Sequence, residues 1–282
     1  MTNREEQRKG RETAVNAQAA KTAEAAQAVE AAQAAKTIQA AFREKAVAVT
    51  GLSKSYSGKK VIENLNLTIR TGQIYGLLGA NGAGKSTAVE CILGTRRADS
   101  GEVRILGLDP VTERRHLFEQ VGVQFQEASY PDRIKVRELC EETACLYEKT
   151  ADYRDLLRQF KLEDKADSML SQLSGGQKQR LFIILALIPG PRVVFLDELT
   201  TGLDTKSRRE VWKCLLEMKD KGLSICLVSH FMDEVEMLCD QIGILRDGMF
   251  VFEGTVKEAV DISPYSNLED AYLWWTQEEE NR

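Results

Sequence analysis

A glycine-rich turn between a predicted strand and a predicted helix limits the folds open to this chain. The turn fits the pattern G-x-x-x-x-G-K-[ST] and reads Gly79-Ala80-Asn81-Gly82-Ala83-Gly84-Lys85-Ser86-Thr87. The apolar run at residues 74–78 predicts a buried strand before it, and residues 86–93 predict a helix after it. This order of elements predicts an α/β core with the turn at one end of a strand.

The same turn predicts a phosphate site. Its backbone N–H groups can point at phosphate oxygens, and the start of the following helix adds partial positive charge. Lys85 can reach the outer phosphates of a nucleotide, and the Ser86 hydroxyl can ligate Mg²⁺. The alternative is a strand-to-helix turn that binds nothing, but the complete pattern in this setting favours nucleotide binding.

Composition places the chain among ordinary globular proteins. With 282 residues, of which 43% are hydrophobic, it can form one large domain or two modest ones. The net charge of -5 gives no overall basic field, so we do not expect nucleic acid as a partner.

No membrane span or export signal is expected. The longest apolar run, residues 181–188, is far shorter than the ~20 residues that a spanning helix needs. The N-terminus mixes acidic and basic residues and has no apolar core, unlike a secretory signal. Six cysteines without a C-x-x-C pair indicate reduced core residues in a cytosolic protein, in preference to a metal or disulfide framework.

Residues 1–45 differ from the rest because alanine dominates them and no Gly or Pro follows Gly10. They predict an extension that is helical or partly disordered, and an interaction helix also remains open. Residues 38–43 echo the start of a calmodulin-binding IQ motif, but Glu44 and Ala48 stand where the motif has glycine and a basic residue. Chance explains this echo better.

From Ala46 onward the pattern is globular. Strands are predicted over residues 47–49, 61–69, 103–105 and 121–125, with alternation from Asn64 that is typical of a half-buried antiparallel strand. Helices are then predicted over residues 136–147, 153–160 and 176–188. Strands and helices alternate again over residues 193–196, 206–219, 224–228, 232–239 and 241–245. A helical block inserted into an alternating chain predicts a nucleotide-binding core with a helical subdomain.

A second motif, Leu173-Ser174-Gly175-Gly176-Gln177, could by itself be a capped helix start. Together with the upstream phosphate loop and the run Val193-Val194-Phe195-Leu196-Asp197-Glu198, it resembles the ATP-binding cassette (ABC) family over about residues 46–254. The resemblance implies an α/β fold with a P-loop NTPase (RecA-like) core, an antiparallel β subdomain and an inserted helical subdomain at about residues 129–188. It implies an ATP-binding domain over residues 46–262 and a helical tail over residues 263–282.

Two acids end the apolar run at residues 193–196, at the strand edge where open α/β sheets bind ligands. By this resemblance, Asp197 holds Mg²⁺ and Glu198 polarises the water that attacks ATP. A solvated turn or a helix cap is the alternative, and the neighbouring phosphate loop makes it the weaker one.

Four further residues take roles only through the resemblance. Gln126 is similar to the glutamine that contacts metal or water and links the core to the helical subdomain, with Gln124 as a less fitting rival. His230 is similar to the histidine that contacts the γ-phosphate, although a lone histidine after a strand is usually structural. Tyr56 stands where an aromatic ring stacks on adenine, and a packed turn tyrosine is its alternative. Asp204 ends a segment similar to the one that links paired sites.

In this family each cassette supplies the segment 174–177 to a nucleotide held by a second cassette. The resemblance therefore implies a dimer, homomeric or heteromeric, that ATP closes and hydrolysis releases. The sequence departs from the family pattern at two places, which bear on the rate of turnover and remove no residue that would bind phosphate or metal. Leu199 stands where proline is usual, and residues 184–189 lack the usual basic side chain.

The segments 94–103 and 267–273 look like those of single-cassette ATPases of bacterial exporters for drugs, antibiotics or surface polymers. The leading hypothesis is an exporter ATPase at the cytoplasmic face of the cell membrane, which it contacts through a separate transmembrane permease. The alternative from the same family is an ATPase that remodels a soluble assembly. An ordinary P-loop kinase conflicts with the second motif.

Overall fold

A computed structural model describes residues 45–125 and 130–276. The predicted extension at residues 1–44 and the echo of an IQ motif therefore lie outside the described residues. Gln126 lies outside them as well.

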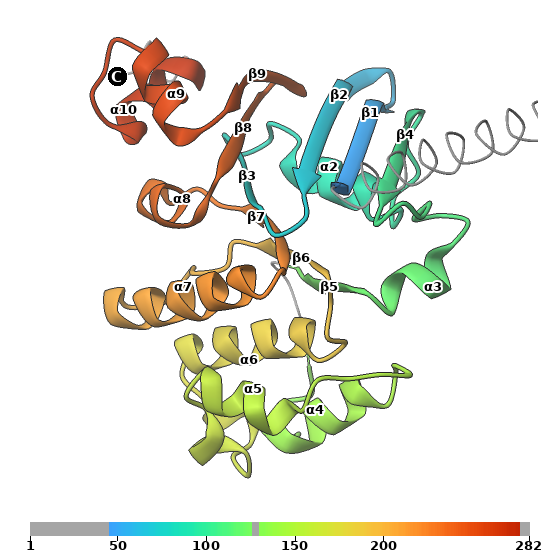
Figure 1. The fold of residues 1–282 in the computed structure, drawn as a ribbon, viewed down its shortest axis with the longest axis vertical. Coiled ribbons are helices and arrows are strands. Elements are labelled where there is room, and N and C mark those ends of the chain that lie inside the picture. The colour runs from blue at the N-terminus through green and yellow to red at the C-terminus, as the bar shows by residue number, and fades with distance from the viewer. Residues whose placement is uncertain (1–44, 126–129, 277–282) are drawn as a thin grey trace, which may run out of the picture. The chain divides into compact units, whose positions relative to one another are not determined.

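A six-stranded sheet forms the centre of the fold, with strand order β5-β6-β7-β3-β8-β9 (Figure 1). Its strands are β3 (Ile74–Gly79), β5 (Val121–Gln124), β6 (Val193–Asp197), β7 (Ser224–Val228), β8 (Gln241–Arg246) and β9 (Met249–Gly254). They run parallel except for β9, which pairs with β8 in the antiparallel sense. Strands β3 and β7 are buried throughout, as their continuous apolar runs require of central parallel strands.

A second, antiparallel sheet has the order β2-β1-β4. It consists of β1 (Lys45–Tyr56), β2 (Lys59–Arg70) and β4 (Ser100–Ile105). On β2, Leu65, Leu67 and Ile69 are buried and the residues between them are more exposed, which confirms the predicted alternation. The first strand is much longer than predicted because a bulge between Val49 and Leu52 carries it past Gly51, whose φ is 62°.

The helices surround these sheets. They are α2 (Lys85–Ile92), α3 (Arg114–Phe118), α4 (Val136–Ala144), α5 (Tyr153–Gln159), α6 (Gly175–Leu187), α7 (Thr205–Asp220), α8 (Met232–Leu238), α9 (Val256–Ile262) and α10 (Leu268–Thr276). Two 3₁₀ turns, η1 (Glu163–Lys165) and η2 (Leu170–Gln172), lie between α5 and α6. Helices α4, α5 and α6 form a block at one end of the molecule, while α9 and α10 lie beside β8 and β9 at the other (Figure 1).

The predicted α/β core with an antiparallel sheet and inserted helices is thus the fold observed. One buried cluster joins α6 to β6 and α7, and it takes up the longest apolar run of the sequence. A second fills the space between the two sheets, and a third lies under α8, α9 and α10. Within residues 45–125 and 130–276, no helix is both long enough and apolar enough to cross a bilayer.

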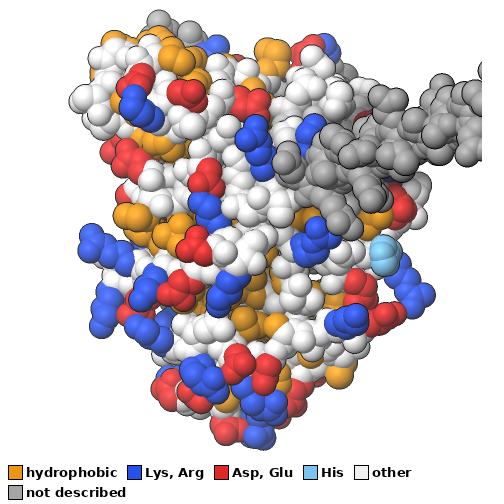
Figure 2. Space-filling view, in the orientation of Figure 1, with side chains coloured by type: hydrophobic (Ala, Val, Ile, Leu, Met, Phe, Trp, Pro, Cys, Tyr) orange, Lys and Arg blue, Asp and Glu red, His pale blue; other side chains and the backbone are white. Residues whose placement is uncertain are grey.

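Charged side chains of both signs lie on the outer surface of this fold. On the face shown in Figure 2, Lys and Arg side chains are interspersed with Asp and Glu, most densely toward the lower end where Figure 1 places the helical block. Such mixing gives that face no broad field of one sign.

Candidate functional site

The phosphate loop joins β3 to α2, as the sequence predicted, and its shape requires glycine. Gly82 and Gly84 have φ values of 84° and 107°, which L-residues rarely adopt. A Cβ atom on Gly79 would lie 2.5 Å from the carbonyl oxygen of Leu245, and one on Gly84 would lie 2.7 Å from that of Val61. Neighbouring strands therefore press directly on the loop backbone and hold its N–H groups in place.

Lys85 is the first residue of α2 and folds back over this loop. Its Nζ atom donates hydrogen bonds to the carbonyl oxygens of Gly79, at 2.6 Å, and Ala80, at 3.0 Å. The ammonium group is thereby fixed at the mouth of the loop, where a phosphate chain would meet it.

A cavity of about 950 Å³ opens above the loop. Predicted residues that line it are Tyr56, Gly79, Asn81, Gly82, Gly84, Lys85, Ser86, Thr87, Asp197, Glu198 and His230. Ala83 is the loop residue that does not line it, because its buried side chain faces the fold and its carbonyl oxygen accepts a hydrogen bond from Gly248. Residues at or just after the ends of four strands, β1, β3, β6 and β7, thus meet in one place.

Asp197 ends β6 and lines the cavity. Burial, together with the charge of Glu198, raises its pKa to about 6, and Lys85 opposes this rise. With the Ser86 hydroxyl beside the same cavity, the donors are hard oxygens of the kind that Mg²⁺ prefers. A divalent cation would also relieve the repulsion between the two carboxylates, so these residues fit the ion.

Asp197 also sets a testable pH dependence of stability. Its folded-state pKa of about 6 lies above the ordinary 3.8, so its charge costs no stability below about pH 4 and an increasing amount as the pH rises to about 6. We expect Asp197→Asn to raise the melting temperature of the nucleotide-free, chelator-treated protein at pH 8. A rise of about 2–4 °C corresponds to about 1 kcal/mol, a value reduced for the partial exposure of the group.

Differential scanning fluorimetry between pH 4 and pH 8 measures this effect. The gain should shrink toward zero near pH 4, and Asp167→Asn, at a carboxylate that is 74% exposed, should show no such trend. An equal gain for Asp197→Asn at every pH would contradict the assignment.

Glu198 follows Asp197 in a strained backbone conformation. Its φ is 50°, in the left-handed region, and its N–H donates to the carbonyl oxygen of Val228 at 2.9 Å. Such strain in a non-glycine residue is typical of functional positions. Its Oε1 atom lies 3.5 Å from Nδ1 of His230, so the structure brings these two predicted residues together.

Tyr56 lies at the rim of the cavity, at the end of β1. Its ring is partly exposed, and the cationic groups of Lys54 and Arg96 each lie 5.4 Å from its centroid. The ring is therefore accessible for stacking, and two cations stand near it to meet negative charge.

The second motif lies outside this cavity. Ser174 caps α6: its hydroxyl accepts from the Gln177 N–H at 3.2 Å, and its own N–H donates to the Gln177 side chain at 2.9 Å. Around Gly175 an added Cβ would meet no atom within 4 Å, whereas one on Gly176 would lie 3.0 Å from Leu203. The motif is a rigid helix start with an open face.

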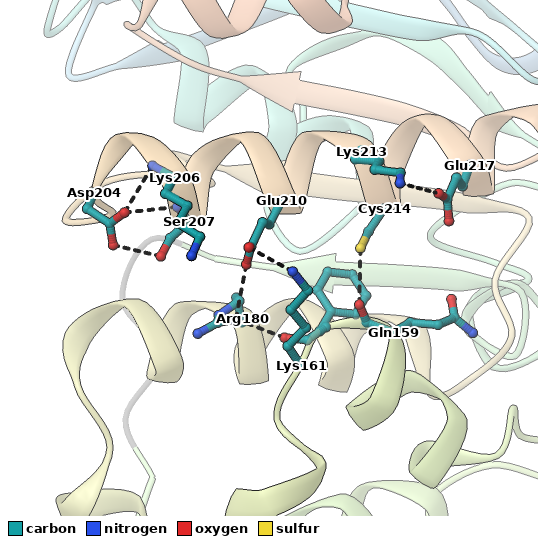
Figure 3. A network of polar contacts seen from close by, with 11 residues as sticks. Gln159, Lys161, Arg180, Asp204, Lys206, Ser207, Glu210, Lys213, Cys214 and Glu217 are labelled. Atoms are coloured by element: carbon teal, nitrogen blue, oxygen red, sulfur yellow. Dashed lines mark hydrogen bonds and ion pairs between the residues drawn. The ribbon is translucent and has the colours of Figure 1, made fainter.

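Asp204 is also outside the cavity and caps α7 (Figure 3). It accepts from the N–H groups of Lys206 and Ser207 at 3.0 Å and from the Ser207 hydroxyl at 2.7 Å. These hydrogen bonds, with Ser207 first, lower its pKa. Further along α7, Glu210 joins Lys161 at 2.7 Å and lies 3.9 Å from Arg180, so it ties α7 to the helical block.

The two departures from the expected pattern lie in the core. Leu199 is fully buried in the cluster that also holds Leu196 and Leu203. Residues 184–188, at the end of α6 and just beyond it, are buried in the same cluster. Apolar side chains at these positions thus pack the interior and do not line the cavity.

The sequence did not indicate two residues that line the cavity, Val61 from β2 and Tyr272 from α10. Val61 was assigned only to a strand. Tyr272 belongs to the tail, and no local pattern shows that α10 packs beside β8 and brings this ring to the phosphate loop.

Comparisons with known proteins agree with this geometry. The family model described as ABC transporter matches residues 62–201. Among curated relatives, a Nod factor export ATP-binding protein I from Rhizobium meliloti is 39% identical over 222 residues, which cover 77% of this chain and 66% of the relative. One from Burkholderia lata is 37% identical over 209 residues, covering 72% and 68%. The chain thus spans about two thirds of the length of these relatives, slightly less for the first.

Solved structures show the same fold. One described as the ATP binding subunit of an ABC transporter matches with a TM-score of 0.74 and 26% identity over 82% of this chain and 99% of that one. A nucleotide-free ATP-binding cassette from an ABC transporter matches with a TM-score of 0.67 and 22% identity, over 75% and 91%, and bears on the fold alone.

Proposed function

Because the chain belongs to the ATP-binding cassette family of ABC transporters, we propose that it is the ATP-hydrolysing subunit of an exporter whose membrane domain is a separate polypeptide. The observation that carries this proposal is that one cavity joins the phosphate loop to Asp197, Glu198 and His230. A mere phosphate-binding turn needs none of these three side chains.

ATP would bind with its adenine on Tyr56 and its phosphates in the loop. Backbone N–H groups and Lys85 meet the phosphate oxygens there. Ser86 and Asp197 would hold Mg²⁺, and Gln126, which lies outside the described residues, is a proposed third contact. The ion supplies neutralisation of charge on the β- and γ-phosphates.

Glu198 and His230 would then carry the hydrolysis. Glu198 orients a water molecule and takes its proton as the water oxygen bonds to the γ-phosphorus, while the bond from that phosphorus to the ADP oxygen breaks. His230 contacts the γ-phosphate and, at 3.5 Å from Glu198, limits the positions open to that carboxylate.

The placement of the second motif supports a dimer. Residues 174–177 and Asp204 do not line the chain's own cavity, so a nucleotide held here lacks the contacts they would make. A second cassette that docks in the opposite sense would supply them, with Ser174 and the first N–H groups of α6 toward the γ-phosphate. ATP then joins the two subunits, and hydrolysis favours their separation.

Export and the membrane location rest on the relatives. Their names describe ATP-binding proteins for Nod factor export, which implies a membrane component apart from the ATP-binding subunit. We propose the same division of labour here, with the helical block of α4, α5 and α6 as the surface that receives the permease on the cytoplasmic side. Selectivity for the cargo would then lie in that permease.

A purification from membranes tests this function. We expect the affinity-tagged full chain, solubilised in mild detergent from the membranes of its own host, to copurify with one multi-span protein. That partner should stimulate ATP hydrolysis after reconstitution. Recovery with ribosomes or nucleic acid alone would overturn transport in favour of a soluble remodelling ATPase.

A further inference from the structure

A fully buried carboxylate lies behind the catalytic cavity. Glu234, in the first turn of α8, has no exposed surface, and both of its carboxylate oxygens are occupied. Oε1 accepts from the indole Nε1–H of Trp212 at 3.1 Å, and Oε2 accepts from the Ser229 hydroxyl at 2.6 Å. Such a group is costly to bury, and an apolar residue of similar volume would usually serve stability as well or better.

The first partner, Ser229, precedes His230 directly. Its Oγ atom donates to Glu234 and also accepts from the N–H of Phe231 at 3.1 Å, so one hydroxyl fixes the backbone on both sides of His230. Ser229 itself is 1% exposed. The orientation of the His230 loop is therefore set from the buried side, through Glu234.

The second partner, Trp212, belongs to α7. Arg208 on the same helix contacts the His230 loop at a second point, because its guanidinium lies 4.6 Å from the centroid of the Phe231 ring. It also donates a hydrogen bond to Asp233 of α8 at 2.7 Å. Helix α7 begins at the Asp204 cap, so it connects that segment to the loop that carries His230. Burial raises the pKa of Glu234, while the hydrogen bonds from Ser229 and Trp212 oppose the rise.

We propose that Glu234 is a positioning residue for ATP hydrolysis, which holds the His230 loop on α7 through Ser229 and Trp212. This inference rests on the proposed ATPase function. A movement of α7 that follows dimer closure would reach His230 through this carboxylate, and His230 in turn stands 3.5 Å from Glu198. Glu234 touches no reacting atom, so it should affect the rate of hydrolysis and leave ATP binding unchanged.

Glu234→Gln tests the proposal. Trp212 can only donate, so the remaining carbonyl oxygen must face it, and the new amide NH₂ must face Ser229. Ser229 then loses the acceptor for its proton. We expect kcat to fall about tenfold and KM for ATP to stay within about twofold, because one such hydrogen bond to a charged group corresponds to about that factor. The double variant Glu234→Gln, Ser229→Ala should have a kcat no lower than that of the less active single variant, because both substitutions break the same hydrogen-bonded link.

Tyr75→Phe is the matched control. It removes another hydrogen bond from an aromatic donor to a carboxylate, Tyr75 to Glu253, of the same 3.1 Å length but at β9. It should leave kcat unchanged, whereas Trp212→Phe should lower kcat. Trp212→Phe should also lower the melting temperature more, because it removes buried volume as well as a hydrogen bond. Trp212→Phe also serves as the test if Glu234→Gln does not fold.

Hydrogen exchange separates this inference from the proposed function, because it needs neither ATP nor turnover. In the nucleotide-free protein, amides of residues 229–231 should exchange at least about fivefold faster in Glu234→Gln, or in Trp212→Phe, and not in Tyr75→Phe. Unchanged exchange there would overturn the proposal. An unchanged kcat or a raised KM in Glu234→Gln would also overturn it. The same holds if the effects of Glu234→Gln and Ser229→Ala on kcat multiply, or if Tyr75→Phe lowers kcat as much as Trp212→Phe does. A wild-type chain without ATPase activity would refute the proposed function alone.

Discussion

Replacing Glu198 by Gln is expected to lower kcat for ATP hydrolysis by at least about 100-fold, while ATP still binds. General-base catalysis by a positioned carboxylate contributes about 10²–10⁴-fold, and an amide cannot take the proton of the attacking water. The Glu198 backbone, with its φ of 50°, places the side chain at the cavity. Glutamine has nearly the same shape as glutamate, so the substitution should leave this geometry unchanged. Release of inorganic phosphate and binding of a fluorescent ATP analogue measure the two quantities separately.

The same variant should accumulate as an ATP-bound dimer, because the step that separates the subunits is blocked. Size-exclusion chromatography with light scattering in the presence of MgATP measures this. The control is Glu217→Gln on the outer side of α7, where the carboxylate lies 3.8 Å from Lys213 and outside the cavity, and it should hydrolyse ATP normally. Retention of more than a tenth of wild-type kcat in Glu198→Gln would exclude Glu198 as the base.

Gly175→Asp should abolish that dimer without harming the monomer. An added Cβ at Gly175 meets no atom within 4 Å, and an acidic residue is favourable in the first turn of a helix. The melting temperature and the ATP affinity of the monomer should therefore stay close to wild type. In a closed dimer the new carboxylate would face the γ-phosphate held by the partner, and two anions in a site of low dielectric repel strongly. We expect kcat to fall at least about 100-fold.

Light scattering of Glu198→Gln with and without Gly175→Asp measures the loss of the dimer directly. Ser171→Asp, at an exposed position on η2, adds the same charge to the helical block and should leave the dimer intact. If Gly175→Asp dimerises normally with ATP, the proposed exchange of residues 174–177 between subunits is wrong.

Sequence patterns predicted the elements of this fold well where local chemistry decides the structure. Continuous apolar runs marked β3, β6 and β7, and the glycine pattern marked the phosphate loop, because both depend on neighbours in the chain. The loop, Asp197 and Glu198 do meet in one cavity, and His230 joins them. Gly175 and Asp204 do not line this cavity, and their service to a second copy stays a prediction.

Sequence patterns did not predict contacts between residues that lie far apart in the chain. Tyr272 reaches the cavity only because α10 packs against β8 and β9, and nothing in residues 267–273 indicates this contact. In the sequence, Glu234 is one of two acidic residues in the first turn of α8, and no local pattern shows that it is buried. Its role depends on Trp212, which follows a different strand, so only the assembled structure shows the pair.

The position of β3 in the sheet governs when the phosphate loop can take its folded shape during synthesis of the protein. Ile74 pairs with Ile225 and Tyr75 with Gln241, so the strand that leads into the phosphate loop acquires its neighbours only after most of the polypeptide has left the ribosome. Until then this apolar central strand has no neighbouring strand to pair with. Such late pairing slows folding and exposes apolar surface that can aggregate. A nascent chain ending near Thr201 would carry the complete glycine pattern and still lack the two strands that shape it.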